Sequence, residues 1–522
     1  MLGRLAQCFP ATTAGVSLCD SVTSLPPVKE VKDIFDNDAK QSNAYVPTTS
    51  LSTQLSGLKR RSTSIGRLAH QTSTASNPSV CAFFVTVSSK NPPLSAHDLS
   101  RSFQSRVIAD EDRYSRFSAS LDSDATHFHQ LQGYNARSSI NPTMHPLAGR
   151  DEVKRLVEDM IMNSSFGATK GSSSSPTVPT AWEGKVSSGP LGSSETISAA
   201  KISEARRAGK THESLLFFSV NHAIGDGVSL GVVMGDLSDE RDNIRAIVDK
   251  EIAKRKANDK KNKARGWRGF LQRLMRQLSR LWWFARGAAI VLKEQLYLTL
   301  FSARSPLEQI IALAASRAAA DSSSARVKRS ISWVDAMSVE EASAIAKSIG
   351  VGKGSSTIND LFVACVGKAI QKQIEEHKKR EGPSLKHLKS DRLKVLVPVH
   401  LYGGVLLPGQ SIGNRIGGFC AELDLSSASS PSRVSSVSSS LSIAKDTPIA
   451  LFAYGLGQFM GLGFVPRFVA RWALHSGTKG ASFALSNVRG PDFPLHYDGR
   501  KVESVAGFLP PPPGCPIGII VQ

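Results

Sequence analysis

The chain has 522 residues, 41% of them hydrophobic, so it is long enough for two or three folded domains with a sizeable core. Lys and Arg outnumber Asp and Glu by 64 to 44, and this net charge of +20 indicates anionic partners such as nucleic acid, a phospholipid surface or a phosphorylated co-substrate. The six cysteines form no CxxC pair, so the sequence indicates neither a zinc site nor a disulfide framework, and it favours a reducing compartment.

The first 78 residues are predicted to be a mostly disordered, Ser/Thr-rich extension. Their start lacks the continuous apolar core of a secretory signal, and acidic residues follow soon after it. Residues 46–80 contain no Asp or Glu and are rich in Ser, Thr and Arg, which is typical of transit peptides. That composition starts later in the chain than in a clear transit peptide. Plastid targeting therefore stays an open alternative.

Residues 79–245 show the pattern of an α/β half. "CAFFVTVSS" from Cys81 predicts a strand, a helix follows a capping Ser95, and "RDEVKRLVEDMIM" predicts an amphipathic helix. Residues 164–178 predict a Ser/Gly/Thr-rich loop. A second buried strand over 214–220 ends just before His222, and the apolar spacing of 228–234 predicts a helix after it.

Residues 246–326 are predicted to be a basic, amphipathic and apolar helical linker. Between Lys254 and Arg280 there are eleven basic residues and one acid, Asp259, a local charge of 11 − 1 = +10. Four leucines share one helical face there, three arginines lie off it, and three tryptophans flank it: Leu271, Leu274, Leu278 and Leu281; Arg273, Arg276 and Arg280; Trp267, Trp282 and Trp283.

This linker is predicted to contact a membrane without spanning it. A span needs about 20 mainly apolar residues, and Arg286, Lys293 and Glu294 interrupt the apolar run that continues to Phe301. A basic amphipathic helix bordered by tryptophans is typical of the headgroup plane. The alternative is a helix packed on the protein with solvated arginines. Nucleic acid is not expected, because no fold signature for it accompanies the charge.

Residues 327–522 are predicted to form a second α/β half. "TINDLFVACVGKAIQKQIEEH" predicts a helix with Asn359 and Asp360 near its start, "DRLKVLVPVHL" a strand, and "GNRIGGFCAELDL" a turn and another strand. A Ser-rich stretch over 426–442 is either a loop or a weak helix. The remainder predicts strands broken by Gly and Pro turns.

His222, Asp226 and Gly227 form an H-x-x-x-D-G pattern at the end of a strand. A neutral imidazole there can take a proton from a hydroxyl as the oxygen attacks a thioester. Asp226 is expected to hold the loop through a buried Arg or backbone amides, and Gly227 to allow close backbone approach. The three residues alone are equally consistent with a histidine and an aspartate that only stabilise the loop. No G-x-S-x-G nucleophile is present, which favours direct attack without an acyl-enzyme.

Five segments in order resemble the bacterial and plant wax ester synthase/diacylglycerol acyltransferase family. "NHAIGDGVSL" resembles its H-H-x-x-x-D-G motif, and "PTAWEG" its P-L-W-E segment. "TINDLFVACVGKAI" is similar to its Asn-Asp helix, "VPVHL…IGNRIGGF" to its Gly-Asn-Arg strand pair, and "SNVRGPDFPLHYDGRKVESVAGFLPPPPG" to its C-terminal block. The resemblance covers about residues 80–522.

The resemblance implies an α/β, two-domain fold like the chloramphenicol acetyltransferase group, with mixed sheets and an inter-domain tunnel. It implies transfer of a fatty acyl group from acyl-CoA, a co-substrate, to a long-chain alcohol or diacylglycerol, with His222 as the general base. Asn221, Asp226 and Gly227 would support the motif, and Asn359 and Asp360 would lie near the site. No bound cofactor or metal is implied. The expected location is the cytoplasmic side of the endoplasmic reticulum or a lipid droplet.

The sequence departs from the family in three places. The first histidine of the motif is Asn221, the usual opening segment is not recognisable in the extension, and the second half is expected to be shortened at its end. Two alternatives remain open. One is another HxxxDG acyltransferase, of BAHD or condensation type, although the BAHD D-F-G-W-G segment is absent. The other is a catalytically degenerate paralogue that binds lipid or membrane.

Overall fold

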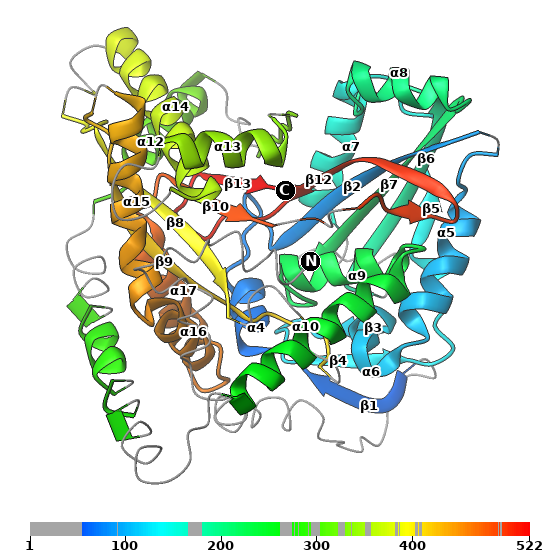
Figure 1. The fold of residues 1–522 in the computed structure, drawn as a ribbon, viewed down its shortest axis with the longest axis horizontal. Coiled ribbons are helices and arrows are strands. Elements are labelled where there is room, and N and C mark those ends of the chain that lie inside the picture. The colour runs from blue at the N-terminus through cyan, green and yellow to red at the C-terminus, as the bar shows by residue number, and fades with distance from the viewer. Residues whose placement is uncertain are drawn as a thin grey trace.

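The computed structural model confirms the predicted α/β class, with two mixed sheets in two halves (Figure 1). The residues that the structure describes run from 55 to 522 with these gaps: 91, 165–179, 262–273, 276, 280, 291, 294–302, 322–328, 336, 350–355, 382–384, 386, 402–405, 407–409, 428, 489 and 491–492. Residues 1–54 and the loop predicted at 164–178, apart from Ser164, lie outside the described residues.

The first half is built on a six-stranded sheet with the order β11-β12-β2-β7-β6-β5. Its central strands β2 and β7 pair antiparallel over ten residues, from Val80 opposite Asn221 to Ser89 opposite His212. Both are rich in aromatic and β-branched residues and are buried on both faces, which explains their nearly continuous apolar pattern. The strands are β2 (Val80–Ser89), β5 (Ile140–Pro142), β6 (Trp182–Pro190), β7 (His212–Asn221), β11 (His496–Tyr497) and β12 (Arg500–Phe508).

The second half is built on a four-stranded sheet with the order β13-β10-β8-β9. β8 and β9 pair antiparallel, whereas β10 is parallel to both of its neighbours. Alternate residues of β9 are buried, because α15 and α16 cover one face of it. The strands are β8 (Arg392–His400), β9 (Ile416–Asp424), β10 (Phe483–Asn487) and β13 (Ile517–Val521).

The second half, predicted at 327–522, also supplies strands to the sheet of the first half. After β10 the chain crosses to the first sheet, where β12 pairs antiparallel with β2 from Lys501 opposite Ser88 to Phe508 opposite Ala82. It then returns as β13 beside β10. The sequence pattern predicts these strands but not this crossing, since alternation fixes the faces of a strand and not its partner.

The predicted extension is also too long, because residues 55–78 are folded. β1 (Leu55–Arg61) joins β3 (Ala119–Leu121) and β4 (His127–Leu131) in a small sheet of order β1-β4-β3. Helix α4 (Ser64–Gln71), capped by Thr63, follows and packs on α16 and α17. A Cβ at Gly461 would collide with the carbonyl oxygen of Ser64, so the helices touch backbone to backbone. The sequence composition of this segment predicts disorder, but its small Ser and Gly residues are what allow this close contact.

Most other predicted elements are confirmed. Ser95 caps α5, the helices after Arg150 and after Asp226 form, Asn359 and Asp360 open α14, and the Ser-rich stretch is a helix. The helices are α5 (Ala96–Phe103), α6 (Glu111–Tyr114), α7 (Arg150–Met162), α8 (Ala199–Arg207), α9 (Gly227–Leu237), α10 (Arg241–Lys261), α12 (Pro306–Asp321), α13 (Val339–Ile349), α14 (Ile358–Glu381), α15 (Ser430–Asp446), α16 (Ile449–Met460) and α17 (Arg467–Thr478).

The central linker begins inside a helix. The predicted boundary between residues 245 and 246 falls within α10, which runs on from the first half without interruption. Arg273, Arg276, Arg280 and Trp267 lie outside the described residues, whereas residues 281–290 are helical. Within the described ranges, no helix combines the length and the apolar character needed to cross a bilayer.

Candidate active site

The loop that carries His222 lies where the two halves meet. His222 follows β7, and its backbone N–H donates to the carbonyl oxygen of Ser79 at 2.9 Å. Its own carbonyl oxygen accepts from Asn414 Nδ2 at 2.8 Å. Ser79 directly precedes β2 in the first half, and Asn414 precedes β9 in the second. Both halves therefore fix the backbone of this histidine.

The His222 side chain has a buried nitrogen without a hydrogen-bond partner among the described residues. The residue is half-buried, and no described residue offers a hydrogen-bond partner to its buried Nδ1. Buried polar atoms in proteins are normally hydrogen-bonded, so an unpaired imidazole nitrogen suits a group that acts on a bound molecule. A neutral imidazole offers one acceptor nitrogen, which is what a general base requires.

Asp226 holds the loop through three partners. The side chain is buried, and its Oδ1 accepts from the backbone N–H of Ser229 at 2.9 Å, which caps α9. Its Oδ2 accepts from the backbone N–H of Arg415 at 2.8 Å and lies 3.8 Å from Nε2 of His400. One carboxylate therefore joins the start of α9 to β8 and to the segment before β9.

Of the two partners expected for Asp226, a buried arginine or backbone amides, the structure shows the amides, and a buried arginine supports the loop through carbonyl oxygens. Arg116 is 2% exposed, and its Nη1 donates to the carbonyl oxygens of Ala223 and Ile224 at 3.3 and 2.9 Å. Burial lowers the pKa of Arg116 to about 9, and the charges of Arg415 and Arg60 act in the same direction. Arg116 comes from η3 (Ser115–Ser118), a segment without a motif, so no sequence signal identified it.

Asn221, in place of the first histidine of the motif, shapes the same loop. Its Oδ1 accepts from the backbone N–H of Ala223 at 2.9 Å, and its Nδ2 lies 3.2 Å from Nδ1 of His70. Burial lowers the pKa of His70, which favours a neutral ring whose Nδ1 accepts from the amide. His70 lies at the end of α4, inside the segment expected to be disordered, so sequence reasoning missed it.

The glycine that permits close packing in the loop is Gly225. A Cβ there would lie 2.8 Å from Cβ of Ser229, closer than two carbons can approach. A Cβ at Gly227 would meet Leu509 and Val488 at 3.9 Å, an ordinary van der Waals contact. The expectation that Gly227 serves close backbone approach is therefore corrected.

Asn359 and Asp360 open α14 in the second half. The Thr357 backbone N–H donates to Asp360 Oδ2 at 2.9 Å, and the Asp360 N–H donates to Thr357 Oγ1 at 3.2 Å, which makes a capping box. The Ser438 hydroxyl on α15 donates to the same carboxylate at 3.1 Å. These contacts join α14 to α15, and the nearness of the pair to His222 stays a prediction.

The "PTAWEG" segment supports the end of β7. Trp182 is fully buried, donates from Nε1 to the Phe117 carbonyl oxygen at 2.7 Å, and stacks on Phe103 with ring centroids 4.5 Å apart. The preceding Ala181 accepts from the backbone N–H of Asn221 at 2.9 Å. This segment therefore positions the strand from which His222 emerges.

His400 is expected to make the protein less stable in acid. Burial lowers its pKa, Arg415 adds to this, and Asp226 opposes it. The unfolded chain, with a His pKa of about 6.5, then binds the proton more readily, so the free energy of unfolding falls as the pH drops below that value. Urea unfolding at pH 7.5 and 5.5 should show a smaller difference for His400→Gln than for the natural chain.

The exposed His97 on α5 provides the matched control for this measurement. His97→Gln should leave the pH dependence of unfolding unchanged. An equal acid-induced loss of stability in the natural chain and in His400→Gln would contradict the role given to His400.

Comparison with known families identifies the C-terminal part of the chain. Residues 412–522 match the family model described as the WS/DGAT C-terminal domain. The chain therefore carries a WS/DGAT C-terminal domain. This match agrees with the family resemblance inferred from the sequence, over the part of the chain that it covers. A comparison with curated proteins gives no significant match.

The solved structures that match this chain are distant from it in sequence. The wax ester synthase/diacylglycerol acyltransferase from Marinobacter aquaeolei VT8 is 14% identical, with 88% of this chain and 90% of that chain covered and a TM-score of 0.46. The trichothecene 15-O-acetyltransferase from Fusarium sporotrichioides is 13% identical, with 92% and 90% covered and a TM-score of 0.47. The first condensation domain of a calcium-dependent antibiotic synthetase is 14% identical, with 89% and 88% covered and a TM-score of 0.42.

The WS/DGAT C-terminal domain completes the His222 loop. It contributes Gly413, whose carbonyl oxygen accepts from the Ser229 hydroxyl at 2.7 Å, together with Asn414 and Arg415. It also contributes β12, the strand that joins the first sheet. The loop and the C-terminal domain therefore form one site rather than two neighbouring motifs.

Proposed function

We propose that this chain is an O-acyltransferase that moves a fatty acyl group from acyl-CoA to a long-chain alcohol, to diacylglycerol, or to both. The observation that carries the proposal is the His222 imidazole, whose backbone is fixed by Ser79 and Asn414 while its buried Nδ1 has no partner among the described residues. A rigid backbone with an unsatisfied ring nitrogen is the arrangement that a positioned general base needs.

In the proposed reaction, an imidazole nitrogen of His222 takes the proton of the acceptor hydroxyl as its oxygen attacks the thioester carbonyl. A carbon–oxygen bond forms, and the resulting tetrahedral intermediate collapses with loss of the carbon–sulfur bond. The leaving CoA thiolate takes the proton back from the imidazolium. No acyl-enzyme is formed, and the steps consume one alcohol and one acyl-CoA for one ester and one CoA.

The other members of the site keep the loop in place and do not react. Asp226, Arg116 and Asn221 pair with backbone groups that follow His222, namely the Ser229 N–H, the Ile224 carbonyl oxygen and the Ala223 N–H. The loop, and not a hydrogen bond to the buried Nδ1, therefore holds the ring. The tunnel between the two halves, the acyl-CoA contacts and the nearness of Asn359 and Asp360 are part of the proposal.

The substrate class is tested by incubating membrane-bearing extract of cells that express the chain with labelled palmitoyl-CoA. Hexadecanol and diacylglycerol are supplied side by side, so label in wax ester or in triacylglycerol names the acceptor. The absence of product from either acceptor would favour the non-catalytic, lipid-binding alternative. Transfer confined to small hydroxylated acceptors would favour another HxxxDG acyltransferase.

The basic linker supports a peripheral location at the endoplasmic reticulum membrane or a lipid droplet. Replacing Arg273, Arg276 and Arg280 by Gln should weaken binding to anionic liposomes, since each basic residue near such a surface contributes about 1 kcal/mol. Co-sedimentation with these vesicles measures the effect. Unchanged sedimentation of the triple variant would remove the linker from membrane contact.

A further inference from the structure

The α16–α17 hairpin presents large apolar side chains to solvent. Leu456, Phe459, Phe464, Phe468 and Trp472 are between 47% and 75% exposed, and we call these five residues the aromatic face. The rings of Phe459 and Phe464 pack edge to face with centroids 5.5 Å apart, so the face continues from α16 into the turn before α17. Contiguous exposed apolar patches mark sites of interaction.

A third helical segment packs on α16 and also exposes large apolar side chains. Residues 281–290 pack on α16 through Phe284 and Phe452, whose ring centroids lie 5.7 Å apart. The same segment leaves Leu281 66% and Trp282 71% exposed. In Figure 1 this segment lies at the lower left of the molecule.

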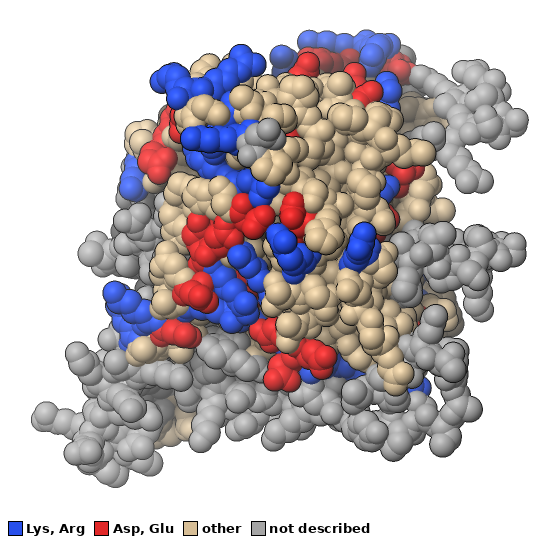
Figure 2. Space-filling view, turned by 90° about the vertical axis from the view of Figure 1, so that its right-hand side faces the viewer, with Lys and Arg blue, Asp and Glu red and all other residues tan. Residues whose placement is uncertain are grey.

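The chain that forms this surface is almost free of acidic residues. No Asp or Glu occurs between Asp446 and Asp492, a stretch that includes Arg467, Arg471 and Lys479. The segment that packs on α16 lies in a second acid-free stretch, from 260 to 293. By contrast, the face shown in Figure 2 mixes acidic and basic residues.

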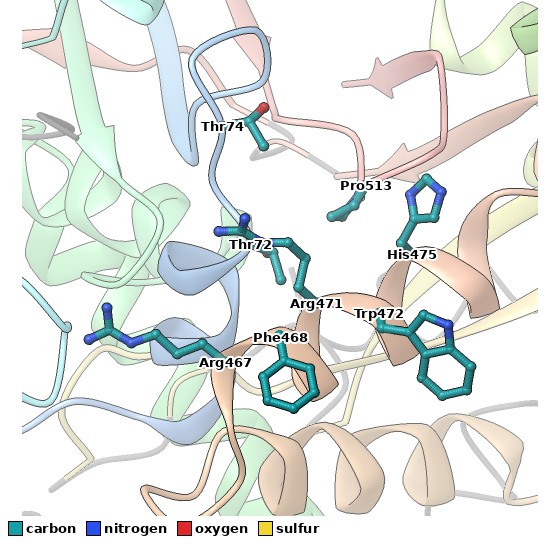
Figure 3. A pocket seen from close by; sticks show the side chains of 8 residues that line it. All are labelled: Thr72, Thr74, Arg467, Phe468, Arg471, Trp472, His475 and Pro513. Carbon is teal, nitrogen blue, oxygen red and sulfur yellow. The ribbon is translucent and has the colours of Figure 1, made fainter. Parts of the chain in front are cut away.

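A cavity opens at the base of the aromatic face (Figure 3). It has a volume of about 530 Å³, and α17 lines it with two arginines, two aromatic rings and a histidine. The α17 residues are Arg467, Phe468, Arg471, Trp472 and His475, and the other lining residues are Thr72, Thr74 and Pro513. Asp124, on the β3–β4 connection, lies 3.9 Å from Arg467 and also pairs with Arg67.

We propose that the aromatic face docks this protein on a bilayer that contains anionic phospholipid, with Arg467 and Arg471 binding a headgroup phosphate at the cavity. Exposed Phe and Trp side chains suit the boundary between acyl chains and headgroups, and neighbouring arginines suit the negative surface of such a membrane. A second copy of the chain fits the face less well, because a symmetric contact would bring the same basic side chains together.

If the proposed function holds, the docked cavity lies where a lipid acceptor would enter the site. Arg471 Nη2 donates to the carbonyl oxygen of Gln71 at 3.0 Å, next to His70, which contacts Asn221. The cavity-lining Thr72 and Thr74 lead to Ser79, the partner of His222. A bilayer on the aromatic face would therefore lie beside the segment that holds the catalytic loop, where a lipid acceptor has to enter.

The test is co-sedimentation of the purified full chain with phosphatidylcholine vesicles that do or do not contain phosphatidylserine. The natural chain should bind the anionic vesicles, and Phe468→Ser with Trp472→Ser should weaken that binding about tenfold or more, because two inserted rings are lost. Arg467→Gln with Arg471→Gln should lower binding to the anionic vesicles only. Excess inorganic phosphate should not release the protein, which separates a lipid headgroup from free phosphate as the ligand.

The matched control pairs Met144→Ser with Arg207→Gln, both exposed and both in the first half. This control should bind vesicles as the natural chain does. Equal binding by the aromatic variant, or no binding by the natural chain, would overturn the proposal. The proposal would also be overturned if light scattering showed that the natural chain is a dimer and the aromatic variant a monomer. Transfer to a detergent-dispersed alcohol should survive in Phe459→Ser with Phe464→Ser, two residues of the aromatic face that do not line the cavity, so loss of docking and failure of the proposed function are distinguishable.

Discussion

The variant His222→Ala should lose acyl transfer while it keeps its fold. Removing a positioned general base lowers the rate by about 10²- to 10⁴-fold. The backbone bonds of this residue to Ser79 and Asn414 use main-chain N–H and C=O groups, which alanine retains. The lost ring leaves no described partner unsatisfied, because its buried Nδ1 has none. We therefore expect kcat to fall with little change in the free energy of unfolding.

The measurement is the initial rate of ester formation for the natural chain and for His222→Ala at equal concentrations of folded protein. Urea unfolding of both proteins checks that the fold is intact. His97→Gln, an exposed histidine on α5, serves as the matched control and should retain full activity. Comparable rates for all three proteins would remove His222 from the mechanism.

Asp226→Ala should be the most destabilising change in the loop. The buried carboxylate caps α9 through Ser229, accepts from the Arg415 N–H and lies beside His400. Loss of the cap costs about 1 kcal/mol, and leaving the partly buried Arg415 N–H unsatisfied costs up to about 1 to 3 kcal/mol. We expect the free energy of unfolding to fall by about 3 kcal/mol, and activity to fall with it because the loop loses its attachment to the second half.

Urea unfolding at neutral pH measures this loss of stability. Asp226→Asn keeps an oxygen for one of the two backbone N–H groups, so it should lose less than the alanine variant. Asp249→Ala, on the exposed surface of α10, should unfold like the natural chain. An Asp226→Ala variant as stable as the Asp249→Ala control would show that the carboxylate does not hold the loop.

The local structure was predictable where one short pattern determines it. The strand before His222, the helix after Asp226 and the Ser95 cap depend on neighbouring residues, and each forms as expected. The place of β12 in the first sheet was not predictable, because its pairing with β2 joins residues more than 400 positions apart. Helix α4 was missed because its Ser and Gly residues resemble a disordered composition, although they serve close helix packing.

The site also combines residues that a local pattern identifies with residues that only long-range packing brings in. His222 and Asp226 are named by their spacing, and the structure places both in one loop. Arg116 and His70 reach that loop from other elements and belong to no motif, so only the folded chain identifies them. His400 lies in the segment "VPVHL", but only the folded chain shows that it meets Asp226. Long-range packing decides which polar groups meet, and a single sequence contains no direct record of it.

One measurement tests the central claim most directly. Labelled palmitoyl-CoA is given to the natural chain and to His222→Ala, each with hexadecanol and diacylglycerol, and the label in wax ester and triacylglycerol is counted. The account predicts ester from the natural chain and almost none from the variant. Equal label in ester from both proteins, or none from either while both remain folded, would contradict it.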